Sequence, residues 1–259
     1  MHKTKWERSL FIKAISIIAL FFAVEANGQT RVAIIDSGIL PFPSAKLCDS
    51  GHYDFINNLP IVGMDIINHG TNVAKAITEN ASTADYCLLI YKVFDEKTKK
   101  DFIPNAIKKA IQSNADIINL AIDSNNGYDA DEYNMLWAAG NKGIQIFLSS
   151  GNSGINLDKN CKIYPVCYKN ILFTIVGNKE SYSNHGKLID LYEASCYNSF
   201  CGTSASVAIA TGKFIADIKH HQYCVDEYKK CISKHECNNK PCTAVGIICR
   251  DNYKQCEGK

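Results

Sequence analysis

Four short segments of the chain place reactive or polar side chains at the ends of apolar runs or beside glycines. They cover residues 32–38, 68–71, 147–154 and 201–206. A serine hydroxyl is a weak nucleophile until a base removes its proton, and that base needs an acidic partner that holds its tautomer. The oxyanion of a tetrahedral intermediate also needs hydrogen-bond donors. Because the segments supply an aspartate, a histidine, an asparagine and a serine in that order, they predict acyl transfer through an activated serine.

Asp36, His69 and Ser204 are the candidates for the three catalytic roles. We expect His69 to act as general base and then as general acid, while Asp36 orients the imidazole and stabilises its cation. Ser204 is the candidate nucleophile because Gly202 precedes it and small residues follow it at the start of a helical stretch. Asn152 supplies an amide where an oxyanion would need a donor.

Each of these residues also has a purely structural interpretation when it is taken alone. Asp36 could be a turn residue, Ser204 could cap a helix, and Asn152 could occupy a left-handed turn between glycines. Other side chains of the same types compete for the roles and are set aside here: Asp54, Asp65, His52, His185 and Ser206. The interpretation as a catalytic site therefore depends on all the roles being filled together.

The order Asp, His, Ser distinguishes this pattern from the same triad on unrelated folds. With these residues laid out, the sequence resembles the subtilisin-like serine protease (subtilase) family from about residue 31 to about residue 219. Further stretches resemble strands and loops of that family, namely residues 89–93, 115–120, 181–186 and 189–191. The resemblance implies a secreted serine endopeptidase that hydrolyses peptide bonds.

The resemblance also implies where a substrate would bind. It makes the Asn152 amide an oxyanion donor, with the backbone N–H of Ser204 as the second donor. An extended peptide would lie as an added strand along residues 120–122, and a second flanking stretch would be residues 99–102. The substrate-binding candidates are Leu120, Ala121, Ile122, Asp123, Ser150 and Gly151. Asp123 stands where the family usually has glycine, so we expect a narrower, more negative wall at that subsite, which would favour basic or small residues.

Several departures from the family pattern lie close to the site. Asn72 and Lys75 stand where a second histidine and a glycine are usual, and Ala208 stands where a proline is usual. They leave an alternative hypothesis open, because a fold does not guarantee its function. In that alternative, the same scaffold has lost proteolysis and acts as a binding or interaction protein.

Residues 1–28 are typical of a secretory signal peptide. Basic residues precede an apolar stretch over residues 14–24, and the small residues Ala26 and Gly28 offer cleavage positions. That stretch is short for a membrane span, which makes an N-terminal anchor the less favoured alternative. We therefore expect a secreted or periplasmic protein with no membrane association after cleavage.

Twelve cysteines lie beyond this segment, and in an exported chain they predict disulfide bonds. Cys161 with Cys167, and Cys196 with Cys201, are close enough to close small loops, but the sequence does not determine the pairing. No Cys-x-x-Cys pair or close His/Cys cluster suggests a metal site. We expect no cofactor and find no indication of calcium, whose stabilising role in the family we expect the disulfides to take.

The hydrophobic pattern predicts an α/β fold with a doubly wound, mainly parallel sheet and helices on both faces. Nearly unbroken apolar runs predict strands at residues 31–35, 88–93, 116–121, 144–148 and 172–176. Three- and four-residue spacing predicts helices at residues 71–79, 104–113, 131–139 and 203–218. Thr71 is expected to cap the first of these helices. Ligands of such sheets bind at the carboxyl ends of the strands.

The expected domain organisation is a signal peptide (residues 1–28), a catalytic domain (29–219) and a cysteine-rich, disulfide-stapled extension (220–259). A chain of 259 residues with 46% hydrophobic residues can bury one substantial core. A formal net charge of +2 gives no reason to expect nucleic acid as a partner. We expect a monomer whose partner is a protein or peptide substrate.

Overall fold

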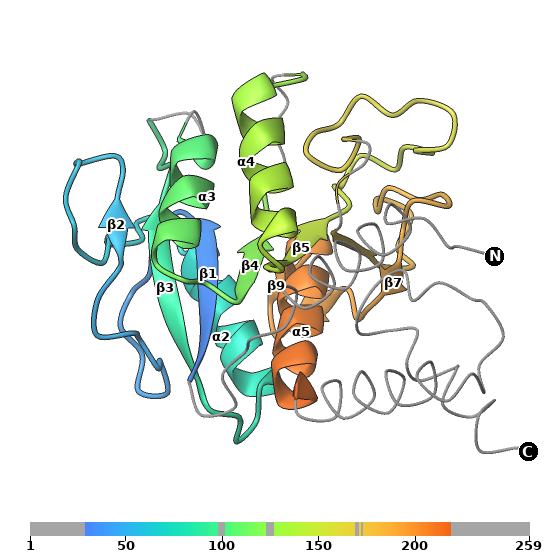
Figure 1. The fold of residues 1–259 in the computed structure, drawn as a ribbon. Helices are drawn as coiled ribbons and strands as arrows, with labels where there is room; N and C mark the ends of the chain where they lie inside the picture. Colours follow the sequence, from blue (N-terminus) through green and yellow to red (C-terminus); the bar gives the residue numbers. More distant parts are fainter. Residues whose placement is uncertain (1–28, 98–101, 123–126, 169–170, 172, 219–259) are drawn as a thin grey trace, which may run out of the picture.

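The computed structural model describes residues 29–97, 102–122, 127–168, 171 and 173–218 (Figure 1). Its centre is a seven-stranded sheet in the order β2-β3-β1-β4-β5-β6-β7, and every pair of neighbouring strands is parallel. The strands are β1 (Thr30–Asp36), β2 (Tyr53–Asp54), β3 (Tyr86–Lys92), β4 (Ile117–Leu120), β5 (Gln145–Ser149), β6 (Thr174–Gly177) and β7 (Leu191–Tyr192). This arrangement confirms the predicted parallel α/β sheet.

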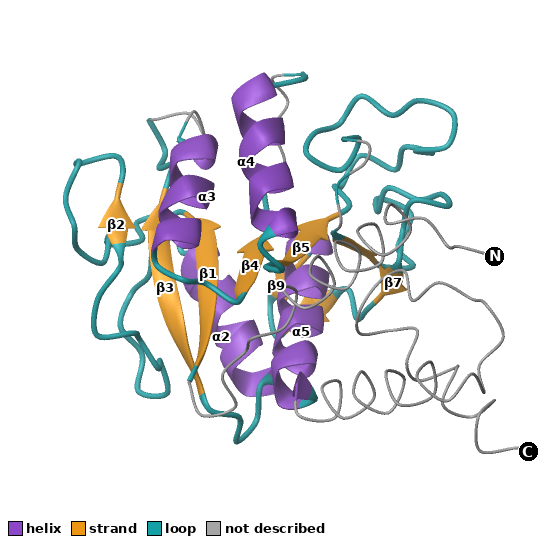
Figure 2. Ribbon diagram, viewed as in Figure 1, coloured by secondary structure: helices purple, strands orange, loops and turns teal. Residues whose placement is uncertain are grey.

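Helices cover both faces of the sheet (Figures 1 and 2). They are α2 (His69–Asn80), α3 (Ile103–Gln112), α4 (Ala130–Asn141) and α5 (Thr203–Ala216). Side chains of β1 alternate between the two faces, so that Val32 and Ile34 pack with α2 and α5, while Ala33 and Ile35 pack with α3 and α4. Central strands are therefore buried on both sides, which explains their unbroken apolar sequences.

The predicted strands and helices are all present, with bounds that differ only at their ends. The sequence analysis missed four two-residue strands: β2, β7, and the antiparallel pair β8 (Cys196–Tyr197) and β9 (Phe200–Cys201). A strand of two residues has no periodicity to detect, and its pairing depends on a neighbour brought by the fold. The β8–β9 hairpin directly precedes α5.

Three disulfide bonds join described residues: Cys48–Cys87, Cys161–Cys167 and Cys196–Cys201. The two small loops are thus confirmed, and the third bond ties the segment before β2 to β3. The other six cysteines, together with the expected signal peptide and C-terminal extension, lie outside the described residues. Within the described ranges, no helix is long and apolar enough to cross a membrane.

Candidate active site

The carboxyl edge of the sheet gathers the four candidate residues from separate elements. Asp36 is the last residue of β1, and Asn152 follows the end of β5. His69 is the first residue of α2, and Ser204 is the second residue of α5. In parallel sheets the strand ends and the following helix starts meet at one edge, where ligands bind. The fold therefore brings together residues that are far apart in the sequence.

A short hydrogen bond joins Asp36 and His69, with Nδ1 of the imidazole 2.7 Å from Oδ1 of the carboxylate. Asp36 is only 1% exposed. The same Oδ1 accepts a hydrogen bond from the backbone N–H of Ser37 at 2.7 Å. Because Nδ1 carries the proton in this bond, a neutral His69 has Nε2 as its basic nitrogen. The pair thus has the tautomer that a general base requires.

The second carboxylate oxygen of Asp36 is buried and has no hydrogen-bond partner among the residues that the structure describes. A buried carboxylate with an unsatisfied oxygen is stabilised by a cation nearby. Proton uptake by His69 would supply that cation beside it. The geometry thus places the ring of His69 where a positive charge would lie next to the carboxylate.

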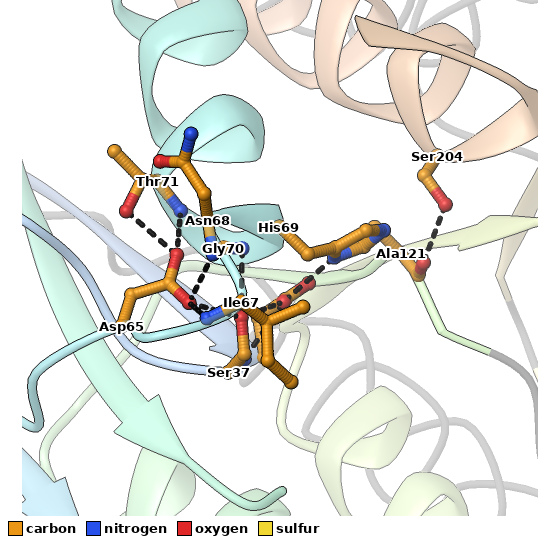
Figure 3. Close-up of polar contacts among 10 residues, drawn as sticks. Ser37, Asp65, Ile67, Asn68, His69, Gly70, Thr71, Ala121 and Ser204 are labelled. Atoms are coloured by element: carbon orange, nitrogen blue, oxygen red, sulfur yellow. Dashed lines mark hydrogen bonds and ion pairs between the residues drawn. The ribbon is translucent and has the colours of Figure 1, made fainter. Parts of the chain in front are cut away.

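Asp65 organises the chain around His69, although the sequence analysis set it aside as a competing carboxylate. It is 1% exposed, and its carboxylate accepts hydrogen bonds from the backbone N–H groups of Ile67, Asn68 and Thr71 at 3.1, 2.8 and 2.8 Å (Figure 3). An aspartate bonding to amides two and three residues later is an Asx turn. That local chemistry is the sequence feature that could have identified Asp65.

The prediction that Thr71 caps α2 is wrong. Its hydroxyl donates to Oδ2 of Asp65 at 2.6 Å and accepts a hydrogen bond from the N–H of Leu40 at 2.9 Å. The N-cap position is Asn68, whose side chain makes no capping bond. Asp65 takes the capping role because its carboxylate reaches the first-turn N–H of Thr71 from outside the helix.

Ser37 connects the two buried carboxylates. Its hydroxyl lies 2.8 Å from Oδ1 of Asp65 and 3.1 Å from Oδ1 of Asp36, and it accepts a hydrogen bond from the N–H of Gly70 at 3.0 Å. The hydroxyl has one proton, and the shorter distance assigns it to Asp65. Asp65 is therefore linked to Asp36 through a single side chain.

Gly70 is required by close packing next to His69. A Cβ atom at this position would lie 2.3 Å from the carbonyl oxygen of Gly38 and 3.1 Å from Cβ of Asp36. The first distance is far below any van der Waals contact, and backbone atoms cannot swing away as a long side chain would. A side chain at position 70 would thus push α2, and with it His69, away from β1.

The hydroxyl of Ser204 donates a hydrogen bond to the carbonyl oxygen of Ala121 at 2.8 Å (Figure 3). Ser204 is 8% exposed, and Ala121 directly follows β4. This bond uses the single proton of the hydroxyl, and a carbonyl at the end of a strand is a suitable acceptor for it. Asp36 and His69 are thus bonded to each other, while Ser204 bonds to the residue that follows β4.

Asn152 contacts the start of α5. Its Oδ1 accepts a hydrogen bond from the N–H of Thr203 at 2.9 Å, and its amide lies beside Gly202, where a Cβ would meet it at 3.4 Å. Because Oδ1 bonds to the helix N-terminus, the Nδ2 group is the part of the side chain left to donate. Asn152 is exposed, so this donor is accessible to a ligand. Nδ2 of Asn152 is therefore a candidate donor to a ligand at this end of α5.

Of the predicted substrate-binding residues, Leu120, Ala121 and Ile122 form the buried end of β4 and the residues just after it. Ser150 is fully buried, and both of its backbone polar groups are hydrogen-bonded: its N–H donates to the carbonyl of Val176, and its carbonyl accepts from the side chain of Asn184. Ser150 therefore stabilises the fold beneath the site. The N–H of Gly151 donates to Thr203 Oγ1 at 3.2 Å, and Asp123 and residues 99–101 lie outside the described residues.

The competing residues have structural partners. His52 donates through Nε2 to the carbonyl of Cys48 at 2.7 Å and accepts through Nδ1 from the N–H of Ile90 at 3.1 Å. Burial lowers the pKa of His52, which favours the neutral ring that these two bonds require. Ser206 is buried, and its hydroxyl donates to the carbonyl of Ala194 at 2.9 Å.

Two further competitors have similar explanations. Asp54 accepts hydrogen bonds from two backbone amides of the turn that follows it. His185 is exposed, and its backbone pairs with Asn156. No group of three or more His, Cys, Asp or Glu side chains that could hold a metal ion occurs within the described ranges.

Solved structures of similar fold are subtilisin-like proteases. A lanthipeptide protease superposes with a TM-score of 0.62 at 23% identity, covering 82% of this chain and 76% of that chain. A cold-adapted subtilisin-like serine proteinase gives 0.60 at 19% identity, covering 76% and 78%. The nisin leader peptidase NisP from Lactococcus lactis gives 0.57 at 18% identity, covering 83% and 81%. These identities are low, so the likeness shows the fold alone.

No curated protein sequence matches the chain. The family model of the subtilases, Peptidase_S8, matches residues 27–227, which include all four candidate residues and every described strand and helix. The parallel sheet, the order of the candidate residues and this match agree, and the chain therefore belongs to the subtilase family.

Proposed function

We propose that this subtilase is an exported serine endopeptidase in which Ser204 attacks the substrate carbonyl. His69 takes the Ser204 proton and returns it to the leaving amine, while Asp36 stabilises the imidazolium. The Nδ2 group of Asn152 and the backbone N–H of Ser204 bind the oxyanion, since the neighbouring N–H groups of Thr203, Ala205 and Ser206 already have acceptors. The observation that carries the proposal is the 2.7 Å bond between Asp36 and His69 in a buried network.

The first step of the proposed reaction is a change of partner for the Ser204 hydroxyl. In the free protein it donates to the Ala121 carbonyl, 2.8 Å away. The attack requires that the hydroxyl leave this oxygen and turn to Nε2 of His69. A staggered rotamer change is a small barrier compared with the chemistry, so the hydrogen bond to Ala121 slows the reaction only modestly.

The proposed substrate is an extended protein or peptide segment that lies beside residues 120–122. Its backbone would pair with the chain just after β4, since the last strand pairs of β4 are those of Asn119 with β1 and of Leu120 with β5. The disulfides within the described residues agree with an oxidising, extracellular or periplasmic location. We further propose that the protein acts as a monomer and that no cofactor takes part in the chemistry.

The test is covalent labelling of the folded protein by a fluorophosphonate probe, which reacts with activated serines. We expect labelling of the wild type and its complete loss in Ser204→Ala. Ser206→Ala is the matched control, because this second serine lies on the same helix but bonds to Ala194. Mass spectrometry of the labelled peptide identifies the modified residue. Labelling that persists in folded Ser204→Ala would exclude Ser204 as the nucleophile.

One observation favours a second candidate function. The Ser204 hydroxyl bonds to a backbone carbonyl, as it would in a scaffold that no longer hydrolyses peptides. A wild type that is folded by circular dichroism and melts cooperatively, yet takes up no label, would support a binding or interaction protein. In that event, a library of peptides incubated with the protein would contain members that bind without being cleaved.

A further inference from the structure

The β8–β9 hairpin directly precedes α5, which carries the candidate nucleophile, and contacts α2, which carries the candidate base. Cys196 and Cys201 pair across it and are joined by a disulfide bond. The hairpin then enters α5 through Gly202, whose N–H donates to the carbonyl of Ser195 at 2.8 Å. Ser204 follows two residues later, so the hairpin and the start of the nucleophile helix form one continuous piece.

The same hairpin lies along α2. The ring of Phe200 contacts the ring of His69 edge to face, with centroids 5.3 Å apart and planes at 82°. Tyr197, which pairs with Phe200 across the hairpin, donates its hydroxyl to the carboxylate of Glu79 in the last turn of α2. The two aromatic side chains therefore contact both ends of the helix whose first residue is His69.

We propose that Phe200 is a positioning residue for His69 and that the Cys196–Cys201 disulfide holds it in place. The inference rests on the proposed function and names a further residue for it. Asp36 holds the imidazole through a hydrogen bond at Nδ1, and the ring of Phe200 packs edge to face against the same imidazole. A phenyl ring packed in this way restricts rotation of the imidazole. Phe200 thus keeps Nε2 directed toward the substrate.

Phe200 is suited to this role by its surroundings. It is half-buried on a two-residue strand and packs at the edge of the core cluster that contains α2 and α5. Phe94, just beyond the end of β3, lies near the same imidazole with centroids 6.4 Å apart. His69 is therefore flanked by two aromatic rings in addition to its carboxylate. Both Cys196 and Cys201 are exposed, so their disulfide holds the two strands of the hairpin together and does not pack in the protein interior.

The first experiment compares Phe200→Ala, Phe200→Leu and Phe200→Tyr. We expect Phe200→Ala to slow fluorophosphonate labelling of Ser204 about tenfold, since small misplacements of catalytic groups cost up to about 100-fold. Phe200→Tyr keeps the ring and should label within about twofold of the wild type, with Phe200→Leu between them. With a peptide substrate, kcat should fall and KM should change little. Tyr192→Ala, an exposed aromatic on β7, is the control.

A second measurement needs no catalysis and separates this inference from the proposed function. The Nδ1 proton of His69 is observed by NMR, and its exchange with water should be faster in Phe200→Ala than in the wild type or Tyr192→Ala. If the wild type takes up no label but the Nδ1 proton exchanges faster in Phe200→Ala than in the wild type, positioning by Phe200 is supported and the endopeptidase is rejected. Unchanged exchange and unchanged labelling in folded Phe200→Ala would overturn the inference. A change confined to KM would also overturn it and make Phe200 a substrate contact.

The disulfide has a matched control in the same chain. Cys161–Cys167 closes a loop of similar size, with a sequence separation of 6 residues against 5 for Cys196–Cys201. We expect the double variant Cys196→Ser/Cys201→Ser to label about fivefold more slowly and to show faster Nδ1 proton exchange. Cys161→Ser/Cys167→Ser should retain the wild-type values. Equal effects of both double variants would reject a specific role for the hairpin bond.

Discussion

Asp36 and His69 lie in a network of buried carboxylates and backbone amides, whereas Asn152 and Ser204 meet at the first turn of α5 beside a two-residue strand. On the base side, Asp36 and Asp65 are each 1% exposed and share the hydroxyl of Ser37. On the nucleophile side, the Ser204 hydroxyl donates to a single carbonyl and Asn152 is exposed. In the proposed mechanism, the base is therefore assembled before substrate arrives, and the nucleophile changes its hydrogen-bond partner when it attacks.

The difference follows from the cost of burying charge. A buried carboxylate requires several donors, so the segments around Asp65 have one low-energy arrangement. A neutral hydroxyl needs only one acceptor and can change it cheaply. We therefore expect the segments around Asp36 and Asp65, which carry charge throughout the proposed reaction, to be the more rigid half of the site.

Glu132, on α4, is a contrasting buried carboxyl. It is 2% exposed, and one of its oxygens has no hydrogen-bond partner within the described part of the chain. Burial raises the pKa of Glu132 to about 7; a hydrogen bond with Tyr168 opposes the shift, and the charge of Asp129 adds to it. The two buried carboxyls thus differ in their partners, since Asp65 accepts hydrogen bonds from three backbone N–H groups.

The largest effect is expected from the nucleophile side. Asn152→Ala removes the Nδ2 donor and should lower kcat by about 100- to 1000-fold with little change in KM, since the donor acts on the transition state. Steady-state kinetics with a cleaved library peptide measure both constants. Asn156→Ala, in the loop that follows, controls for loss of an amide. An unchanged kcat would show that Asn152 is not part of the site, and only Ser204 would remain on the nucleophile side of the comparison.

A smaller effect tests the base side. Asp65→Asn places an amide NH₂ against backbone donors and should lower the free energy of unfolding by about 3 kcal/mol. Because Asp65 also orders the start of α2, labelling of Ser204 should slow at temperatures where the variant is folded. Asp54→Asn is the matched control, since Asp54 is 2% exposed and bonds to turn amides away from His69. Urea unfolding and labelling rates make the comparison. Equal labelling rates in the two folded variants would contradict a role for Asp65 in presenting His69.

The smallest effect concerns Glu132 and pH. Its folded pKa of about 7 lies above the ordinary value of 4.5, so the folded state binds more protons than the unfolded state. The stabilisation is complete below pH 4.5 and is lost as pH rises through 7, by about 1.4 kcal/mol between pH 6 and pH 8. Glu132→Gln should flatten this part of the curve. Glu180→Gln, an exposed control, should leave it unchanged, and a slope that persists without Glu132 would assign it to another group.

Local pattern was enough for the central part of the fold. Apolar runs predicted β1 and β3–β6, and helical spacing predicted α2–α5, because both signals come from neighbouring residues. The same reasoning placed Asp36 at a strand end and His69 at a helix start. The short strands and the Cys48–Cys87 bond were missed, since each depends on segments that approach only after folding. The turn formed by Asp65 was a local signal, but its link to Asp36 through Ser37 was not.

The amino-acid sequence alone determines the alternation of strands with helices and the linear order of Asp36, His69, Asn152 and Ser204. Which oxygen the Ser204 hydroxyl bonds to, and which ring packs on His69, became clear only from the folded chain. Helices and strands form largely through interactions between residues close in sequence, so local patterns predict them. A hydrogen bond or ring contact depends on the placement of distant segments to within a fraction of an ångström, and no local pattern encodes it.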